Sequence, residues 1–324
     1  MSPIEGPEFS EAGCVIRVDN LSKVYGDVRA VDGISFQIFG GEVFAFLGPN
    51  GAGKTTTVEM LEMIREPTGG NIRIFGEDLD ATRKTVRERI GVLPQEFKSF
   101  DRLTVRETLL YYQKLYDGEV WDVDEIIGLL DLEEKSDTQY MHLSGGLRQR
   151  VGVGIALVND PDIVFLDEPT TGLDPRARRE VWGIIRLLKE KGKTVFLTTH
   201  YMEEAEQLAD RVCIIHRGSI IARGSVGELI STYGGGRVMV ISGCDRDCLV
   251  AMAESLGLDL KPVDSSSSIP VPDIDTAMRI LSYLKETGLP YREVDIRGPT
   301  LEDVFLSLTG EALDDGVKSG GADA

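Results

Sequence analysis

A glycine-rich segment carries the residue types that hold phosphate groups. Residues 48–55 read GPNGAGKT and fit the pattern G-x-x-x-x-G-K-[ST] in full. Glycines let backbone N–H groups curl around a phosphate without Cβ clashes. The ammonium of Lys54 can neutralise phosphate oxygens, and the hydroxyl of Thr55 can reach a magnesium ion. An apolar run at 42–47 precedes the segment and helical spacing follows over 54–64, which is the strand–loop–helix context that such a loop requires.

A pair of acids ends an apolar stretch much further along the chain. Residues 163–166 predict a buried strand, and Asp167 and Glu168 follow it directly. Asp167 is expected beside the phosphate loop, where it would hold Mg²⁺ through a water molecule. Glu168 is positioned to orient or deprotonate an attacking water. The alternative, that Glu168 only caps the following turn, stays open.

A second candidate phosphate site stands at the start of another helix. The helix predicted at 146–158 follows Ser144, Gly145 and Gly146. Unpaired N–H groups at a helix start favour an anion. Two anion sites in one chain can bind two ligands, or they can meet across a dimer on one nucleotide.

These motifs, in this order, resemble the ATP-binding cassette (ABC) family, whose signature LSGGQ is similar to residues 143–147 here. The resemblance covers about residues 15–231. It implies an α/β fold of the P-loop NTPase class with a helical insert, ATP and Mg²⁺ as cofactors, and two copies that close head to tail. Leu147 stands where the family often has Gln, and we expect activity to survive because Ser144, Gly145 and Gly146 remain.

The resemblance also implies roles for residues that would attract no notice alone. Tyr25 matches the aromatic that stacks on adenine, Gln95 the glutamine that contacts Mg²⁺ and the partner subunit, and His200 the histidine that touches the γ-phosphate. Asp174 matches the loop that crosses the dimer seam, and a turn or N-cap role before Pro175 is compatible with this. The implied catalytic residues are Lys54, Gln95, Glu168 and His200, and the implied metal-binding residues are Thr55, Gln95 and Asp167. The implied nucleotide-contacting residues are Tyr25, Gly48, Pro49, Asn50, Gly51, Ala52, Gly53, Lys54, Thr55, Thr56, Ser144, Gly145, Gly146 and Asp174.

The hydrophobic pattern predicts the elements that must position these residues. Strands alternating with helices favour a mainly parallel sheet covered on both sides. An insert over about 97–150 is mostly helical, with helices at 104–115 and 123–130. The other predicted helices cover 177–189 and 202–208. Strands are predicted at 14–18, 34–39, 42–47, 71–75, 90–93, 162–166, 194–198 and 212–215.

A smaller module is predicted after the glycines at 234–236. Its order over 237–310 is strand, helix, strand, strand, helix, strand, which is typical of a split βαβ or ferredoxin-like α+β fold. Thr300 is expected to cap a final helix. The ATPase domain is then 14–233, and we expect residues 1–13 and 311–324 to be disordered.

Residues 299–306 (PTLEDVFL) are similar to the ending of drug-resistance-type ABC-2 export ATPases. This resemblance implies an ATP-hydrolysing exporter subunit that works with an integral membrane permease of ABC-2 type, and hence a cytoplasmic chain peripheral at the inner face of the cell membrane. Some apolar residues of the insert are expected to form the groove for the permease's cytoplasmic helix. The candidates are Phe97, Phe100, Leu103, Leu109, Tyr111 and Tyr112.

The composition limits the alternatives. The formal net charge is −19, and an acidic surface repels phosphate backbones, which argues against nucleic acid as a partner. Four cysteines without a disulfide framework fit a reducing compartment. No apolar window is long enough to span a membrane, and no secretion signal begins the chain. A soluble ABC ATPase acting on DNA or ribosomes, and a non-catalytic nucleotide sensor, stay open as alternatives.

Overall fold

The computed structural model describes residues 13–118, 120–258, 261–263 and 266–311. Within them the chain divides into two compact units, of which the first ends at Val226 and the second begins at Gly227. The division falls one helix before the expected boundary near Tyr233, because α8 (Val226–Tyr233) groups with the second unit. The expected disorder falls almost entirely on residues 1–12 and 312–324, which lie outside the described residues.

A six-stranded sheet forms the centre of the first unit, and all of its neighbouring strands are parallel except the last pair. Every residue of three of the parallel strands is buried, which explains why their sequences read as continuous apolar runs. The predicted mainly parallel sheet is confirmed. In spatial order its strands are β6 (Ile90–Leu93), β7 (Ile163–Asp167), β8 (Thr194–Thr199), β3 (Val43–Leu47), β9 (Arg211–His216) and β10 (Ser219–Gly224).

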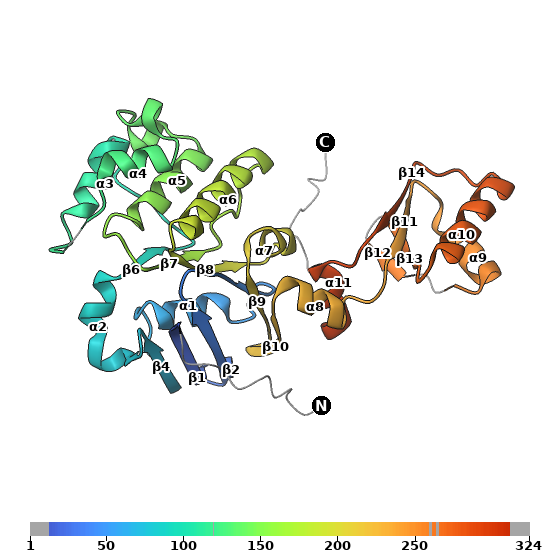
Figure 1. Ribbon diagram of the computed structural model, residues 1–324, viewed down its shortest axis with the longest axis horizontal. Helices are drawn as coiled ribbons and strands as arrows, with labels where there is room; N and C mark the ends of the chain where they lie inside the picture. Colours follow the sequence, from blue (N-terminus) through green and yellow to red (C-terminus); the bar gives the residue numbers. More distant parts are fainter. Residues whose placement is uncertain (1–12, 119, 259–260, 264–265, 312–324) are drawn as a thin grey trace. The chain divides into compact units, whose positions relative to one another are not determined.

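The two faces of this sheet have different covers. Successive side chains of a strand point to opposite faces, so Val195 and Leu197 pack into a helix-covered core while Phe196 between them packs into the other core. Helices cover the first face, as Figure 1 shows above the sheet. They are α3 (Val105–Gln113), α4 (Val123–Leu129), α5 (Gly145–Ile155), α6 (Pro175–Glu190) and α7 (Met202–Leu208), with short 3₁₀ turns at Glu133–Lys135 and Tyr140–His142.

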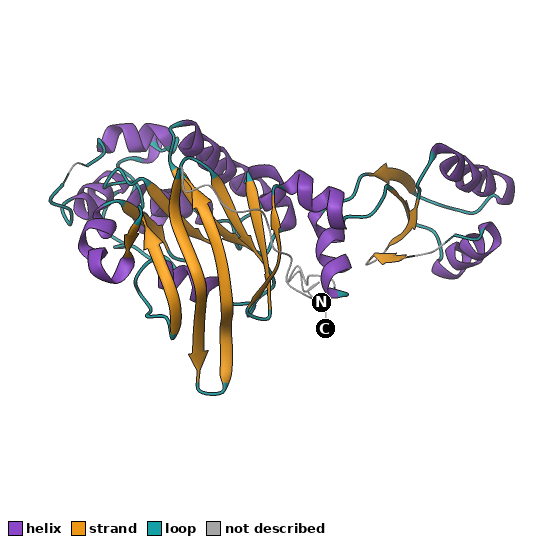
Figure 2. Ribbon diagram, turned by 60° about the horizontal axis from the view of Figure 1, so that its bottom comes forward, coloured by secondary structure: helices purple, strands orange, loops and turns teal. Residues whose placement is uncertain are grey.

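A separate antiparallel sheet and two helices, α1 (Lys54–Leu61) and α2 (Leu79–Glu88), cover the other face, and α2 adds Leu79 and Val86 to this core. Figure 2 shows the long strands of this sheet in orange. They are β1 (Cys14–Tyr25), β2 (Val28–Phe39), β4 (Gly69–Ile74) and the short β5 (Glu77–Asp78). The first two strands are much longer than the predicted 14–18 and 34–39. The parts that were not predicted, residues 19–25 and 28–33, are largely polar and pair with irregular register, so they lack a clean two-residue alternation of apolar and polar residues.

Two other differences from the predicted elements have simple causes. Helix α1 ends at Leu61 rather than at Ile64, because Met63 takes a left-handed φ of 61°. Helix α2 (Leu79–Glu88) was not predicted, because its sequence LDATRKTVRE is mostly polar and has only two large apolar residues, Leu79 and Val86.

Strand β6 and helix α5 are in direct backbone contact. A Cβ added at Gly91 would lie 1.7 Å from the carbonyl oxygen of Ala156, so only glycine fits there. On the same helix, a Cβ at Gly152 would lie 2.7 Å from Leu93 Cδ1. At Gly91 backbone therefore meets backbone, and at Gly152 the Leu93 side chain lies directly against the helix.

The second unit has the predicted order and topology. Its antiparallel sheet has the spatial order β12, β13, β11, β14, with a core that includes Met239, Leu249 and Ile280. Thr300 caps the last helix through a capping box with Asp303. The elements are β11 (Val238–Ser242), α9 (Arg246–Leu256), β12 (Lys261–Val263), β13 (Ser266–Pro270), α10 (Ile274–Thr287), β14 (Glu293–Arg297) and α11 (Leu301–Thr309). None of the helices in the described ranges is long and apolar enough to cross a membrane.

Candidate functional site

The glycine-rich loop joins β3 to α1, which is the context that the sequence predicts. Gly53 is the N-cap of α1 with φ 107°, and a Cβ there would lie 2.5 Å from Ala30 O. A residue with a side chain would therefore be both strained and in collision. Residues 48–56 thus bring the first backbone N–H groups of α1 to the loop, as an anion site requires.

Lys54 reaches back over the loop to an acid from another strand. Its ammonium donates to Gly48 O at 2.8 Å and lies 3.1 Å from Glu168 Oε1, and both side chains are 4% exposed. Burial lowers the pKa of Lys54, and the negative charge of Glu168 opposes this shift. A bound phosphate would compete with Glu168 for the same ammonium.

The four catalytic candidates meet at the Glu168 carboxylate. Besides Lys54 on one oxygen, the other oxygen accepts hydrogen bonds from Thr171 Oγ1 at 3.1 Å and Gln95 Nε2 at 3.3 Å. His200 Nδ1 lies 3.2 Å from that same oxygen, although the two groups are not aligned for a hydrogen bond. Sequence reasoning did not identify Thr171 as a partner of Glu168.

Glu168 is kept in its ionised form. Burial alone would raise its pKa, but the nearby His200 ring and the Lys54 ammonium outweigh burial and lower the pKa of Glu168 to about 2. A carboxylate that stays charged can accept a hydrogen bond from a water molecule. The arrangement is therefore suited to orienting a nucleophilic water.

The backbone of Glu168 is strained. Its φ is 48°, in the left-handed region, which costs on the order of 1–3 kcal/mol for a residue other than glycine. The Glu168 N–H donates to Thr198 Oγ1 at 2.9 Å and lies 3.2 Å from Thr198 O. Such strain persists only where surrounding contacts hold it, and it concentrates at functional sites.

Asp167 and Thr55 present adjacent oxygen atoms beside the loop. The hydroxyls of Thr198 and Thr55 both hydrogen-bond to the Asp167 carboxylate. Burial raises the pKa of Asp167, and these bonds oppose that shift. In the part of the chain that the structure describes, no group of three or more His, Cys, Asp or Glu could hold a metal by itself. One carboxylate and a hydroxyl nonetheless fit Mg²⁺, which usually takes few protein ligands and completes its shell with phosphates and water.

The Ser144 turn lies apart from the glycine loop of its own chain. Ser144 caps α5 and accepts from Leu147 N at 3.4 Å, while Asp174 caps α6 and accepts from Arg176 N at 2.9 Å. Together with Gly145 and Gly146 these residues line a broad hollow of about 920 Å³, and no residue of the glycine loop lines it. The structure therefore does not bring the two phosphate-binding turns together within one chain.

Tyr25 ends β1 with its ring 39% exposed. Two cations flank the ring, with Lys23 Nζ 5.3 Å and Arg65 Cζ 5.4 Å from its centre. The contact with Arg65 was not predicted, because Arg65 follows α1 and is distant from Tyr25 along the chain. A partly exposed ring remains accessible to a base.

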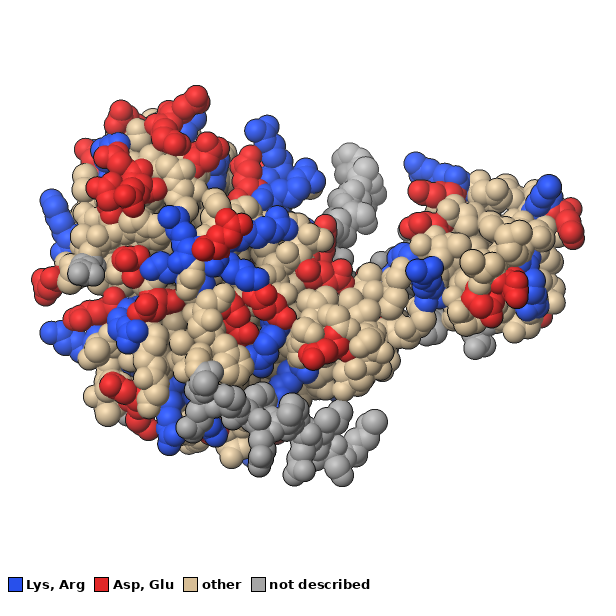
Figure 3. Space-filling view, viewed as in Figure 1, with Lys and Arg blue, Asp and Glu red and all other residues tan. Residues whose placement is uncertain are grey.

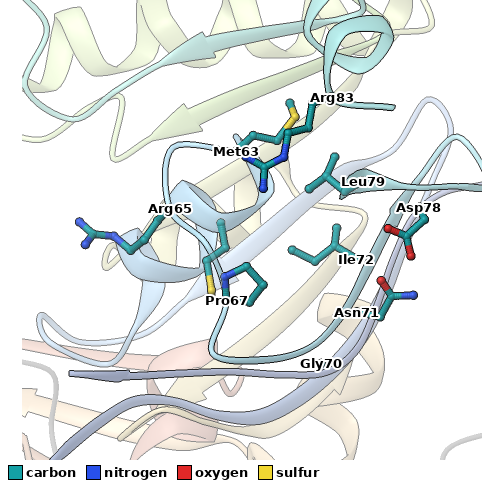
Figure 4. A pocket seen from close by; sticks show the side chains of 10 residues that line it. Met63, Arg65, Pro67, Gly70, Asn71, Ile72, Asp78, Leu79 and Arg83 are labelled. Carbon is teal, nitrogen blue, oxygen red and sulfur yellow. The ribbon is translucent and has the colours of Figure 1, made fainter. Parts of the chain in front are cut away.

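A small hollow elsewhere in the first unit is not a candidate site. Figure 4 shows Met63, Arg65, Ile72 and Leu79 among the side chains around it. Its volume is about 20 Å³, which is room for roughly one water molecule. None of the predicted site residues lines it.

Comparisons with known proteins find similar sequences over most of the chain. The sequence pattern described as "ABC transporter" matches residues 31–171. The chain is 41% identical over 309 residues to Nod factor export ATP-binding protein I of Paraburkholderia xenovorans (strain LB400), covering 93% of this chain and 98% of the relative. It is 38% identical over 310 residues to the daunorubicin/doxorubicin resistance ATP-binding protein DrrA of Streptomyces peucetius, covering 93% and 94%.

Solved structures of similar fold are also ATP-binding subunits or cassettes. A structure described as the ATP-binding subunit of an ABC transporter superposes with a TM-score of 0.60 at 28% identity, covering 68% of this chain and 93% of that one. A dimeric ATP-binding cassette in a post-hydrolysis state, bound to ADP and phosphate, superposes with a TM-score of 0.58 at 27% identity. That match covers 65% of this chain and 98% of that one.

Proposed function

Because the chain belongs to the ABC transporter family of ATP-binding proteins, and is therefore an ATPase, we propose that it powers an ABC-2-type exporter. Lys54, Gln95 and His200 all converge on the buried Glu168 carboxylate, and this single observation carries the ATP-hydrolysing part of the proposal. A sensor without catalysis has no need for a charged carboxylate held in a strained turn. The exporter role follows the relatives, whose names describe export and drug resistance.

In the proposed reaction the glycine loop binds the phosphates of ATP. The ammonium of Lys54, now shared between Gly48 O and Glu168, would bind phosphate oxygens instead. Glu168 would then orient the attacking water and accept its proton, with His200 and Gln95 beside the same carboxylate oxygen. Mg²⁺, held by Thr55 and Asp167 with Gln95 nearby, would neutralise charge on the phosphates.

Two copies would supply one complete site. The Ser144 turn offers backbone N–H groups at the start of α5, and they face a solvent-open hollow. We propose that a second copy approaches head to tail, so that its nucleotide lies against this turn and beside Asp174. The match to a dimeric cassette supports this arrangement.

The test is the pair Glu168→Gln and wild type, each with ATP and Mg²⁺. Loss of a general base lowers the rate by typically ~10²–10⁴-fold, so the variant should hydrolyse ATP that much more slowly while still binding it. It should also accumulate as an ATP-dependent dimer in size-exclusion chromatography. Wild-type turnover in this variant would remove Glu168 from the mechanism.

The permease partner is proposed to dock on the helical insert. Phe100 and Tyr111 are 48% and 44% exposed, and their rings meet edge to face at 4.9 Å. Phe97 instead packs against Tyr140 and Gly152 within the insert, and Leu109 is fully buried. The proposed groove is therefore narrower than the sequence indicates, and it centres on Phe100 and Tyr111.

Charge on the helical insert suggests the kind of helix that would bind. Figure 3 shows acidic side chains gathered over the helical insert, where α4 and the turns beside it carry Asp122, Asp124, Glu125, Asp131, Glu133 and Glu134. An amphipathic permease helix with basic flanks would complement this surface. It would keep the chain peripheral at the cytoplasmic face of the membrane.

Phe100→Glu should abolish copurification with the permease while leaving ATP hydrolysis by the isolated chain unchanged. The side chain is exposed, so its replacement should not disturb the fold. Ile64→Glu is the matched control, because Ile64 is 64% exposed but lies outside the insert. Undiminished copurification of Phe100→Glu would refute the docking assignment.

A further inference from the structure

A fully buried acid lies behind the site and has no role in the proposed reaction. Glu204 in α7 is 0% exposed. Its Oε1 accepts hydrogen bonds from the hydroxyl of Thr170 and from the indole N–H of Trp182, both at 2.8 Å. Glutamate is almost never fully buried unless it is paired, and these bonds satisfy only one of its oxygens, because Oε2 has no hydrogen-bond partner within the described ranges.

Each bond leads to a segment that carries a candidate ATP-site residue. Thr170 lies in the turn that follows Glu168. Trp182 lies in α6, whose N-cap is Asp174. Glu204 itself lies in α7, which begins just after His200. One carboxylate oxygen therefore joins three segments that are distant along the chain.

The turn that Glu204 holds is the one that carries the strained Glu168. Thr171 N–H donates to Glu168 O, and Leu173 N–H donates to Thr170 O, each at 3.2 Å. Thr171 also donates through its hydroxyl to the Glu168 carboxylate at 3.1 Å. The hydrogen bond from Thr170 to Glu204 therefore holds the same turn that positions Glu168 through Thr171.

A stacked contact links the same helices by a second route. The guanidinium of Arg178 in α6 lies 4.2 Å from the centre of the Tyr201 ring. That ring lies 4.1 Å from the centre of the His200 ring. The position of α6 is thus coupled to His200 through Arg178 and Tyr201, and to Glu168 through Trp182 and Glu204.

We propose that Glu204 is a positioning residue for ATP hydrolysis, which holds the turn of Glu168, helix α6 and the segment of His200 in register by accepting hydrogen bonds from Thr170 and Trp182. This rests on the proposed function, in which Glu168 acts on water. Glu204 touches no nucleotide atom in this scheme, so its loss should misplace the reacting groups without removing any of them.

The acceptor, rather than the negative charge, is the property that matters. Burial raises the pKa of Glu204, and the hydrogen bonds from Thr170 and Trp182 oppose that shift. Glutamine keeps a carbonyl oxygen at the same place and can accept the same two bonds. Methionine has similar length and no strong acceptor.

The experiment compares Glu204→Gln with Glu204→Met in steady-state ATP hydrolysis, with unfolding followed in parallel. Misplacement by about 1 Å costs about 10²-fold, so the Met variant should lose about 10- to 100-fold in kcat. Its KM for ATP should stay within about twofold, because the glycine loop keeps its contacts. The Gln variant should restore kcat to within about threefold of wild type.

Thr170→Val decides the matter even if the Met variant does not fold, because valine keeps the shape and removes one donor. It should lower kcat with an unchanged KM. Thr108→Val in α3 is the matched control: Thr108 is also 0% exposed, and its hydroxyl has no hydrogen-bond partner in the described ranges. This control should keep wild-type kcat.

Wild-type kcat in Thr170→Val would overturn the proposal, as would equal losses in the Gln and Met variants of Glu204. Failure of the proposed function has a different signature, namely wild-type turnover in Glu168→Gln. A slow Glu168→Gln together with a fast Thr170→Val would therefore reject the positioning role alone.

Discussion

The two phosphate-binding turns of the first unit differ in how far one chain completes them. In the glycine loop, here called the enclosed half, Gly48 is buried and Lys54 is only 4% exposed against Glu168, while Asn50 and Gly51 at the tip are exposed. The Ser144 turn is open, with Ser144 and Gly145 exposed at the edge of a hollow of about 920 Å³. The chain therefore builds one half of a nucleotide site around its own acids and presents the other half on its surface.

Mixing two defective variants tests this division most strongly. Lys54→Ala removes the cation of the enclosed half, and Ser144→Asp sets a negative charge in the open half. Each variant alone should lose about 10²-fold or more in turnover. A mixed dimer has one site with both defects and one intact site, so the mixture should hydrolyse ATP well above the sum of its parts.

The control for this mixture is Lys54→Ala combined with the double variant Lys54→Ala/Ser282→Asp, because Ser282 is exposed on α10 in the second unit and no dimer in that mixture has an intact glycine loop. That mixture should stay at background. Background activity in the Lys54→Ala and Ser144→Asp mixture would contradict a site shared between two copies.

Variants of Tyr25 test which half of the site, the glycine loop or the Ser144 turn, binds the adenine base of ATP. The ring is exposed beside the enclosed half, between Lys23 and Arg65. Stacking of a base on an aromatic ring is worth ~1–3 kcal/mol. Tyr25→Ala should therefore raise the KM for ATP by about 5- to 100-fold, whereas Tyr25→Phe should leave it nearly unchanged. An unchanged KM in Tyr25→Ala would assign the base to other residues.

The enclosed half should also respond to acid. The pKa of Glu168 is about 2 in the folded chain, below its ordinary value of 4.5. The unfolded chain therefore takes up the proton first, so the stability that this carboxylate contributes is present above about pH 4.5 and is lost as the pH falls toward 2.

Urea unfolding at several pH values should thus show a shallower acid loss of stability in Glu168→Gln than in wild type. Glu286→Gln is the control, because Glu286 is exposed on α10. Parallel curves for wild type and Glu168→Gln would mean that the Lys54 pairing does not stabilise the fold.

The central sheet and the glycine loop could be predicted because their signals are local. Strand β6 and helix α7 begin and end at the predicted residues, since each is a short periodic or apolar run between clear breaks. Helix α2 escaped prediction because its sequence is mostly polar, with Leu79 and Val86 as its only large apolar residues.

Some residues of the candidate site could likewise be predicted from local motifs, and others could not. Lys54 and Glu168 were predicted from local motifs and family resemblance, and they lie 3.1 Å apart. Two partners were not predicted: Thr198, which accepts a hydrogen bond from the Glu168 N–H, and Glu204, which accepts one from Thr170. A hydrogen bond between segments that are distant along the chain leaves no periodic pattern in the sequence. A polar residue within a buried strand, such as Thr198 in β8, is the one hint that sequence offers for such a partner.

The missing side chain at Gly91 has a mechanical consequence. Strand β6 leads into the loop of Gln95, and α5 begins at the Ser144 turn. Because the backbone of β6 contacts the backbone at the end of α5 directly, no side chain between them can rearrange when β6 is displaced. A permease helix that binds this loop would therefore move β6 and α5 together. The Ser144 turn at the start of α5 would then change its orientation along with the strand.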